Sequence, residues 1–525
     1  MTDAPNIRRG LVTCGVAFVA IAALYLGLLG LASRGQPSFA DGYDGIGFVL
    51  AISEFDLARF QPHPPGFPVF VLLGRALHAL LPITPSVAVA SVSAIFLSAG
   101  LSAIAGVLAA QAGRYAAALF VLLTAPHTLL GGLGVATLSD GAGLGAGLLY
   151  LALLAFCLHQ PSRALAVLCG LCGGLALGIR PPAAVPLFLG TILLAGLAHR
   201  RGRSLRGPLL TVSGSAALAC LLWLLPLLSI VGGSRFWALC LAHARGHVSD
   251  FGGGLWADAG RTPSLLWGAG LVARLPAIGL AVVRALGPAI VGLALIVPLA
   301  MGIAAPLRPK RRSLLPPSLR VQSLALWALT ATYIVYVALS TRLLGNGRHL
   351  LPVPVAVAAA LAVLFAALLR SQAGRAGLLI ALALSAIHST AQIWAFRSDP
   401  APGLKLVSTL PDCRARLYGA AAARFYDLRC GSGSAQPAIY LGEVLSDLER
   451  RSNPPAEVLV TSEVIASPAS RARLRPLARA CVSPSVPSTL RFFGVPSPPP
   501  RPLTSAADAG PDTDCVELFA YRVLP

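Results

Sequence analysis

Long apolar stretches without polar interruption dominate the pattern of hydrophobic and polar positions along this chain. The first stretch, 11–31, follows Arg8 and Arg9. At about 20 residues it is long enough to cross roughly 30 Å of hydrocarbon. A signal peptide is the alternative, with Ala32-Ser33 as its cleavage site, but cleaved signals have a shorter apolar core. We therefore predict an uncleaved membrane anchor.

Further apolar stretches recur along the chain. They cover residues 87–110, 115–131, 140–158, 164–179, 183–198, 209–230, 285–305, 323–339, 350–369 and 377–396. Together with the anchor they predict an all-α polytopic membrane protein with about 11 transmembrane helices. The stretch at 67–81 is shorter and contains Arg75 and His78. We expect it to form an amphipathic helix on the outer membrane surface instead of a span.

Glycines at four-residue spacing occur inside several predicted spans. They form the series Gly141 and Gly145, Gly143 and Gly147, and Gly170, Gly174 and Gly178. Small residues at this spacing let helices approach closely in lipid, where burial of apolar surface supplies little driving force. We expect these glycines to pack helices and not to bind phosphate.

Clusters of basic residues orient the predicted spans. Cytoplasmic loops are rich in lysine and arginine, which places Arg8-Arg9 and the clusters at 199–203 and 308–312 in the cytoplasm. The first loop, at 32–86, is then outside, and an odd number of crossings must separate it from the cluster at 199–203. This parity holds only if 67–81 is not a span. The tail from residue 397 is also expected outside.

The tail differs in composition from the rest of the chain, so we divide the sequence into a transmembrane domain at 1–399 and a second domain at 400–525. Strand-like runs lie at 438–441, 458–461 and 515–521, with a helical pattern at 443–451. These features predict a small extracytoplasmic α/β domain. Its cysteines are Cys413, Cys430, Cys481 and Cys515. They allow two disulfides in an oxidising compartment, with three connectivities open.

Composition supports the membrane class and narrows the partners. Of 525 residues, 56% are hydrophobic and 12% charged, whereas soluble domains carry about 25% charged residues. A net charge of +21 would suggest nucleic acid in a soluble protein, but here the arginines gather in short loops. We expect membrane lipid or a phosphorylated lipid as partner, and no nucleic acid. Richness in Ala, Leu and Arg indicates a multi-pass protein of a bacterial cell inner membrane.

The loop at 32–86 concentrates the candidate chemistry, with carboxylates at Asp41, Asp44, Glu54 and Asp56. Charges near lipid are costly and usually functional, and a carboxylate beside an apolar wall suits a general base. We favour Asp44 as the catalytic residue, with Asp41 as the alternative. For Asp41, Glu54 and Asp56, an ordinary solvated loop competes with function.

A stiff turn, His63-Pro64-Pro65-Gly66, follows in the same loop. Proline fixes its own φ and restricts the residue before it. We expect the turn to lead the chain into the helix at 67–81 and to aim His63 at the substrate. A turn with no contact between His63 and substrate is the alternative.

Four more candidate substrate-binding residues lie on the same outer side. Asp140 opens a span, either as a helix cap or as a second acid of the site. Arg180 ends a span, where it either snorkels or binds a phosphate. Arg348 and His349 lie in a short outer loop, where a forked guanidinium suits phosphate and a helix boundary is the alternative. His243 and His247 have a metal-pair spacing, but without a third ligand we interpret 231–284 as an interfacial loop.

Taken in order, these motifs resemble the GT-C membrane glycosyltransferases, especially the protein O-mannosyltransferase and aminoarabinose-transferase branch. The resemblance is carried by Asp41-Gly-Tyr-Asp44, by His63-Pro-Pro-Gly-Phe-Pro-Val-Phe-Val-Leu-Leu-Gly-Arg75, by Asp140, by Gly178-Ile-Arg180-Pro and by Gly347-Arg348-His349-Leu-Leu-Pro352. It covers residues 1–400 in architecture. The segment from His63 to Arg75 is its most specific part.

The resemblance implies transfer of a sugar, with inversion, from a polyprenyl-phosphate donor to an acceptor on the external side. It implies that Asp44, or Asp41 in a shifted alignment, acts on the acceptor and that Arg348 lies near the donor phosphate. The family often has Asp-Glu where this chain has Asp44-Gly45, so the metal requirement and the acceptor, whether lipid, glycan or protein, stay open. The cofactor is unknown: a divalent metal is compatible with the motifs but not indicated by them.

Two other classes compete with a glycosyltransferase. A transporter or lipid flippase would also be polytopic and basic, but transporters place ionisable residues near the midplane and often have inverted repeats. No clear repeat is visible here. A non-catalytic protein of envelope-polysaccharide assembly would keep the fold without needing Asp44 or Arg348.

Overall fold

The computed structural model describes residues 4–33, 42–159, 162–181, 206–249, 350–366 and 386–394, five strands between 417 and 522, and single residues or runs of two or three residues elsewhere. Asp41, Arg348 and His349 lie outside the described residues. The longer helices are α1 (Ala4–Ser33), α2 (Gly42–Ser53), α3 (Pro68–Leu80), α4 (Pro85–Gln111), α5 (Arg114–Thr124), α6 (Thr128–Gly134), α7 (Ser139–His159), α8 (Arg163–Ile179), α10 (Arg206–Val231), α11 (Gly233–Ser249) and α15 (Pro352–Ala366).

Helices long and apolar enough to cross a membrane lie where the sequence predicts them. Four described stretches qualify: Arg8–Leu31, Pro85–Gln111, Ser139–Cys157 and Arg206–Val231. The predicted span at 115–131 is broken into α5 and α6, which meet at 75°, and Pro126 in the break cannot donate a helical hydrogen bond. Counting this pair gives up to five spans among the described residues. The predicted spans at 285–305 and 323–339 fall almost entirely outside those residues, so the larger number stays a prediction.

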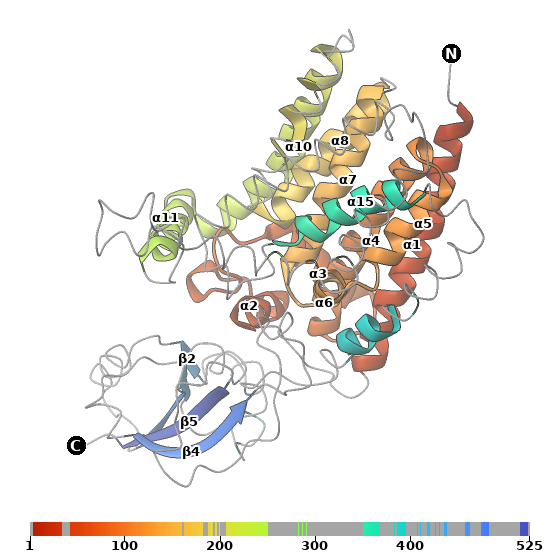
Figure 1. Cartoon of the computed structure of the whole chain (residues 1–525). Coiled ribbons are helices and arrows are strands. Elements are labelled where there is room, and N and C mark those ends of the chain that lie inside the picture. Colours follow the sequence, from red (N-terminus) through yellow and green to blue (C-terminus); the bar gives the residue numbers. More distant parts are fainter. Residues whose placement is uncertain are drawn as a thin grey trace, which may run out of the picture.

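Neighbouring helices pack in the order α1, α4, α7, α8 and α10, with α5 on α4 and α15 on α5 (Figure 1). Glycines set the distance at several crossings. A Cβ on Gly145 would meet the carbonyl of Phe96, and one on Gly174 would lie 2.5 Å from the carbonyl of Ala216 on α10. The indole of Trp223 also donates to the Gly174 carbonyl, at 2.9 Å. These contacts confirm that Gly145 of α7 and Gly174 of α8 let helices pack closely.

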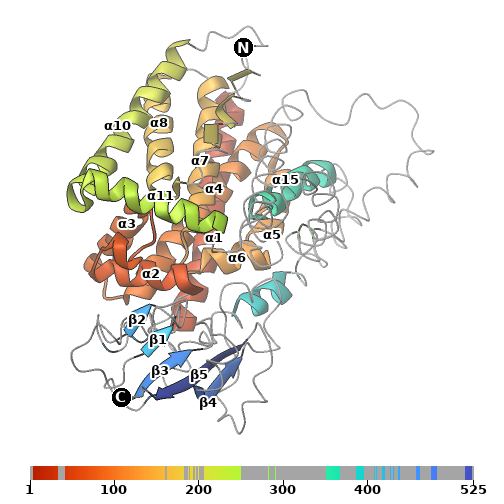
Figure 2. The same cartoon turned by 90° about the vertical axis from the view of Figure 1, so that its left-hand side faces the viewer.

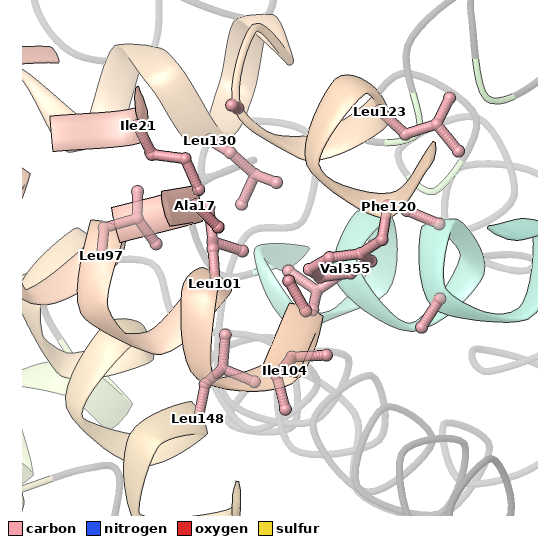
Figure 3. Close-up of a cluster of buried hydrophobic side chains, with 14 of the residues drawn as sticks. Ala17, Ile21, Leu97, Leu101, Ile104, Phe120, Leu123, Leu130, Leu148 and Val355 are labelled. Atoms are coloured by element: carbon pink, nitrogen blue, oxygen red, sulfur yellow. The ribbon is translucent and has the colours of Figure 1, made fainter. Parts of the chain in front are cut away.

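The main apolar core lies between these helices. It includes Ala17 and Ile21 of α1, Leu97 and Leu101 of α4, Phe120 of α5 and Val355 of α15 (Figure 3). Leucine side chains of the bundle that face away from this core are exposed, among them Leu222 and Leu225 of α10. Such an apolar exterior suits a lipid surrounding.

Two short elements and a loop cover one end of the bundle. α2 and α3 lie at the end where α1 and α10 finish, on the side of the β-strands (Figure 2). Between them is the 3-10 helix η1 (Leu57–Arg59), capped by a hydrogen bond from the Ala58 amide to Asp56. The helix predicted at 67–81 is present as α3. Its 13 residues are too few to span a bilayer, and Leu72 and Leu80 are exposed on it.

The C-terminal strands form one five-stranded sheet in the order β2-β1-β3-β5-β4. Their bounds are β1 Leu417–Gly419, β2 Ala435–Pro437, β3 Glu457–Thr461, β4 Leu474–Cys481 and β5 Cys515–Arg522. β1 pairs in parallel with β2 and β3, and β5 is antiparallel to β3 and β4. The strands predicted at 458–461 and 515–521 match β3 and β5, whereas the pattern missed β4 and placed the run at 438–441 just after β2. The helix predicted at 443–451 lies outside the described residues.

Candidate functional site

The candidate site is built around Asp44, in the first turn of α2. Its Oδ1 lies 3.5 Å from Nδ1 of His63, and the two side chains are only 26% and 15% exposed. His63 comes from the loop before α3. The structure therefore brings together the two residues of the first loop that the sequence singled out for chemistry.

Aromatic rings form the wall behind this pair. The His63 ring lies 4.7 Å from that of Phe67 and 5.8 Å from that of Phe48, measured between centroids. Phe48 in turn packs edge-on against Phe67 and Phe70, at 5.1 and 5.0 Å. All three phenylalanines are buried. A carboxylate and an imidazole thus sit at the edge of an apolar surface, where electrostatic interactions are stronger than in open water.

The local sequence explains how the loop holds His63 in place. The amide of Gly66 donates to the carbonyl of His63 at 3.0 Å, which closes the predicted His63–Gly66 turn. Gly66 has φ +100°, and Phe60 and Phe67 have φ of 56° and 48°. Left-handed backbone at bulky residues costs about 1–2 kcal/mol each, and such strain persists only where the surrounding structure enforces it.

Two contacts hold α2 against this loop. A Cβ on Gly47 would lie 2.6 Å from the carbonyl oxygen of Phe60, so only glycine permits this approach. At the other end of α2, Nε and a terminal nitrogen of Arg75 both donate to the carbonyl of Ala51, at 3.1 and 2.8 Å. The conformation of the loop and the position of the helix are therefore coupled.

A second charged pair lies at the start of α7. Arg180 donates to Oδ1 of Asp140 at 2.8 Å and to the hydroxyl of Ser139 at 2.9 Å. Asp140 is 3% exposed and Arg180 is 12% exposed. Gly143 leaves space for the arginine stem, since a Cβ there would lie 2.5 Å from its Cδ. Asp140 and Arg180, both predicted to contact substrate, are thus paired with each other.

The two pairs border the same apolar cluster. Phe48, one turn after Asp44, is buried in it together with Ala142 of α7 and Ile179 of α8. Asp140 precedes Ala142 by two residues and Arg180 follows Ile179, so each charged pair lies next to this cluster. Arg348 and His349 immediately precede Leu350, which is buried in the main core.

His243 of α11 is a candidate that the sequence did not assign to the site. Its ring lies 5.2 Å from the His63 ring and 5.8 Å from the Phe60 ring. The signal was present as a helical periodicity, because Phe236 and Cys240 precede His243 at steps of four and three and share its side of α11. The structure has this helix in the first part of the stretch 231–284, which we interpreted as an interfacial loop.

Within the described part of the chain, no group of three or more His, Cys, Asp or Glu side chains is arranged to hold a metal ion. In the C-terminal part, Cys430 takes part in a disulfide. Cys481 and Cys515 are directly opposite in the register of β4 and β5.

Comparison with known proteins gives structural likenesses only. The sequence matches no protein-family model and no curated protein. The chain is similar to ArnT from Cupriavidus metallidurans, solved in the apo state and bound to undecaprenyl phosphate, with 15% identity and a TM-score of 0.44 over 96% of this chain and 97% of that one. It is also similar to the archaeal oligosaccharyltransferase AglB from Archaeoglobus fulgidus, with 12% identity and a TM-score of 0.45 over 95% and 75%.

Proposed function

We propose that this protein transfers a sugar from a polyprenyl-phosphate donor to an acceptor at the outer face of the membrane. The observation that carries the proposal is the Asp44–His63 pair, 3.5 Å apart and mostly buried against an aromatic wall. A carboxylate held at the edge of an apolar surface can accept a proton from an acceptor hydroxyl or amine. The lipid donor approaches the same end of the bundle from the membrane.

The reaction balances with groups that the chain supplies. As the acceptor oxygen or nitrogen attacks the anomeric carbon, its proton passes to the carboxylate of Asp44. The bond between that carbon and the phosphate oxygen breaks, and polyprenyl phosphate leaves with the bonding electron pair. Attack opposite to the leaving group inverts the anomeric centre. His63 orients the carboxylate, and the leaving phosphate requires positive charge, which we assign to Arg348 with help from His349.

The Asp140–Arg180 pair is proposed to border the donor. The charge of Arg180 is neutralised by Asp140, and the side chain of Arg180 is still 12% exposed. Arg180 is therefore better suited to donate a hydrogen bond to a sugar or phosphate oxygen than to balance the charge of a phosphate. Both members lie at a helix end and not at a midplane, in contrast to the usual position of ionisable residues in transporters. This placement supports a transferase over a flippase.

The test is turnover by the purified full chain in vesicles with a mixed pool of polyprenyl-phosphate sugars and candidate lipid, glycan and peptide acceptors. We expect Asp44→Asn to lower turnover about 10²–10⁴-fold, the usual contribution of a general base, with donor binding retained. Glu54→Gln is the matched control, because Glu54 is an exposed carboxylate of the same loop that pairs with Arg59. Equal turnover by wild type and Asp44→Asn would reject the assignment. Lipid movement across vesicles without any transfer would favour the flippase.

A further inference from the structure

Helix α11 crosses the end of a predicted span instead of extending it. α10 ends at Val231, and Gly232, with φ +85°, turns the chain before α11 begins at Gly233. Figure 2 shows α11 running across the bundle from the end of α10. Since α10 is long and apolar enough to cross a membrane, α11 begins at the level where that span leaves the hydrocarbon.

The inward side of α11 packs on the candidate site. Phe236 is 4% exposed and is buried with Leu57 and Leu227, and Leu239 and Cys240 pack against this small cluster. One turn further, the His243 ring lies 5.2 Å from that of His63. The inward side of α11 therefore has apolar residues that fix the helix to the bundle and, next to them, a histidine that contacts the site.

The outward side of α11 carries large apolar residues that no described part of the chain covers. Trp237 is 61% exposed and Leu241, four residues later, is 56% exposed. Residues at this spacing lie on one side of a helix. Arg235 and Arg245, near the two ends of the same helix, are also exposed.

This outward side continues the lipid-facing surface of α10. Leu225 and Ile230, in the last two turns of α10, are 58% and 71% exposed, so exposed apolar surface extends from the span to the start of α11. Tryptophan is enriched at membrane interfaces, and arginine is attracted to anionic headgroups. An amphipathic helix of this kind lies in the plane of the interface.

We propose that the outward side of α11 binds an anionic membrane surface through Trp237 and Leu241, and that this binding holds His243 against His63. His243 is then a positioning residue, which acts through His63. Binding of the helix to lipid stands independently of the proposed function, whereas its consequence for turnover rests on it.

The first measurement locates Trp237. The full chain is reconstituted in vesicles of equal parts phosphatidylglycerol and phosphatidylcholine, with bromine on the acyl chains at different depths. The difference in fluorescence between wild type and Trp237→Phe isolates the signal of Trp237. We expect the shallow bromines to quench it most strongly and aqueous iodide to quench it weakly. Quenching by iodide alone, or by neither reagent because another protein copy covers the residue, would overturn the proposal.

The second measurement tests the link between lipid and site. Cys240 on the inward side serves as a reporter, with its alkylation followed by peptide mass spectrometry. We expect Trp237→Ser with Leu241→Ser to raise Cys240 alkylation severalfold in vesicles, and Ala238→Ser, an exposed small residue of the same helix, to leave it unchanged. Unchanged alkylation in the double variant would overturn the link.

A third measurement examines His243 itself. For a positioning residue, His243→Ala should lower kcat several times more than it changes KM for the donor, and His243→Phe, which keeps a ring against His63, should restore most of kcat. A change confined to KM would overturn the positioning role. If no variant or wild type transfers sugar, the proposed function fails while the two measurements on Trp237 and Cys240 still decide whether α11 binds lipid.

Discussion

Oδ1 of Asp44 lies 3.5 Å from Nδ1 of His63, although one residue belongs to a helix and the other to a loop. Residues outside the pair keep the two side chains at this distance. Gly47 lets α2 approach the carbonyl of Phe60, and Arg75 holds the far end of the same helix through Ala51. The pair can therefore be tested both directly and through the residues that position it.

The direct test replaces His63. We expect His63→Ala to lower turnover of the proposed transfer about ten- to hundredfold, because His63 orients the Asp44 carboxylate and a misplacement of about 1 Å can lower a rate about a hundredfold. The measurement is kcat and KM for the donor. His78→Ala is the control, since His78 is an exposed histidine of α3 that contacts only the carbonyl of Ile83 among the contacts described for it. Equal effects of the two variants would show that His63 does not contribute to the reaction.

Gly47→Ala tests the packing of α2 on the loop. The new Cβ would lie 2.6 Å from the carbonyl of Phe60, and overpacking of this kind costs about 1–3 kcal/mol. We expect a lower melting temperature in detergent. Gly27→Ala is the matched control on α1, where nothing lies within 4 Å of the added Cβ and alanine favours the helix by up to about 1 kcal/mol. Similar melting temperatures for both variants would contradict the tight contact.

Arg75→Lys tests the two hydrogen bonds that the guanidinium of Arg75 donates to the carbonyl of Ala51. Lysine keeps the charge but loses the planar pair of donors, and each hydrogen bond contributes about 0.5–1.5 kcal/mol. We expect faster amide hydrogen exchange in the last turn of α2, which can be followed by mass spectrometry. Arg114→Lys, an exposed arginine at the start of α5, should leave that exchange unchanged. An unaltered exchange rate in Arg75→Lys would mean that other contacts hold the helix end.

The Asp140–Arg180 pair predicts a strongly non-additive pair of substitutions. Arg180→Met leaves the buried carboxylate of Asp140 without its partner. Breaking a buried ion pair in this way lowers the free energy of unfolding by about 3–5 kcal/mol. Adding Asp140→Asn removes that charge, so the double variant should be more stable than Arg180→Met alone. The measurement is a double-mutant cycle on the free energy of unfolding. Additive effects would show that the two side chains do not interact.

Cys240 gives a prediction for pH. Burial raises the pKa of its thiol, and only the thiolate reacts with alkylating agents. The rate of alkylation should therefore keep rising with pH beyond the point where an exposed thiol levels off. A pH series with iodoacetamide, read at the Cys240 peptide and compared with free glutathione, measures this. Levelling off together with glutathione would contradict the burial of this side of α11.

Structural features that depend only on neighbouring residues were predicted well. The apolar length of α1, α4 and α10 and the proline-rich turn at His63 depend on neighbouring residues only, and the structure has them at the expected positions. The break between α5 and α6 was missed, although Pro126 marks it. An apolar run in the sequence indicates only that a segment is hydrophobic and how long it is. A bend of the helix inside that segment does not change the apolar pattern.

The sequence by itself determined the membrane class and the loop at 32–86 as the place for chemistry, because apolar length and the position of charges depend on composition along the chain. Only the tertiary structure decided that Arg180 pairs with Asp140, that Gly143 accommodates that arginine and not another helix, and that His243 reaches His63. These relationships join residues far apart in the sequence. Each depends on how helices pack, which no local pattern of residues contains.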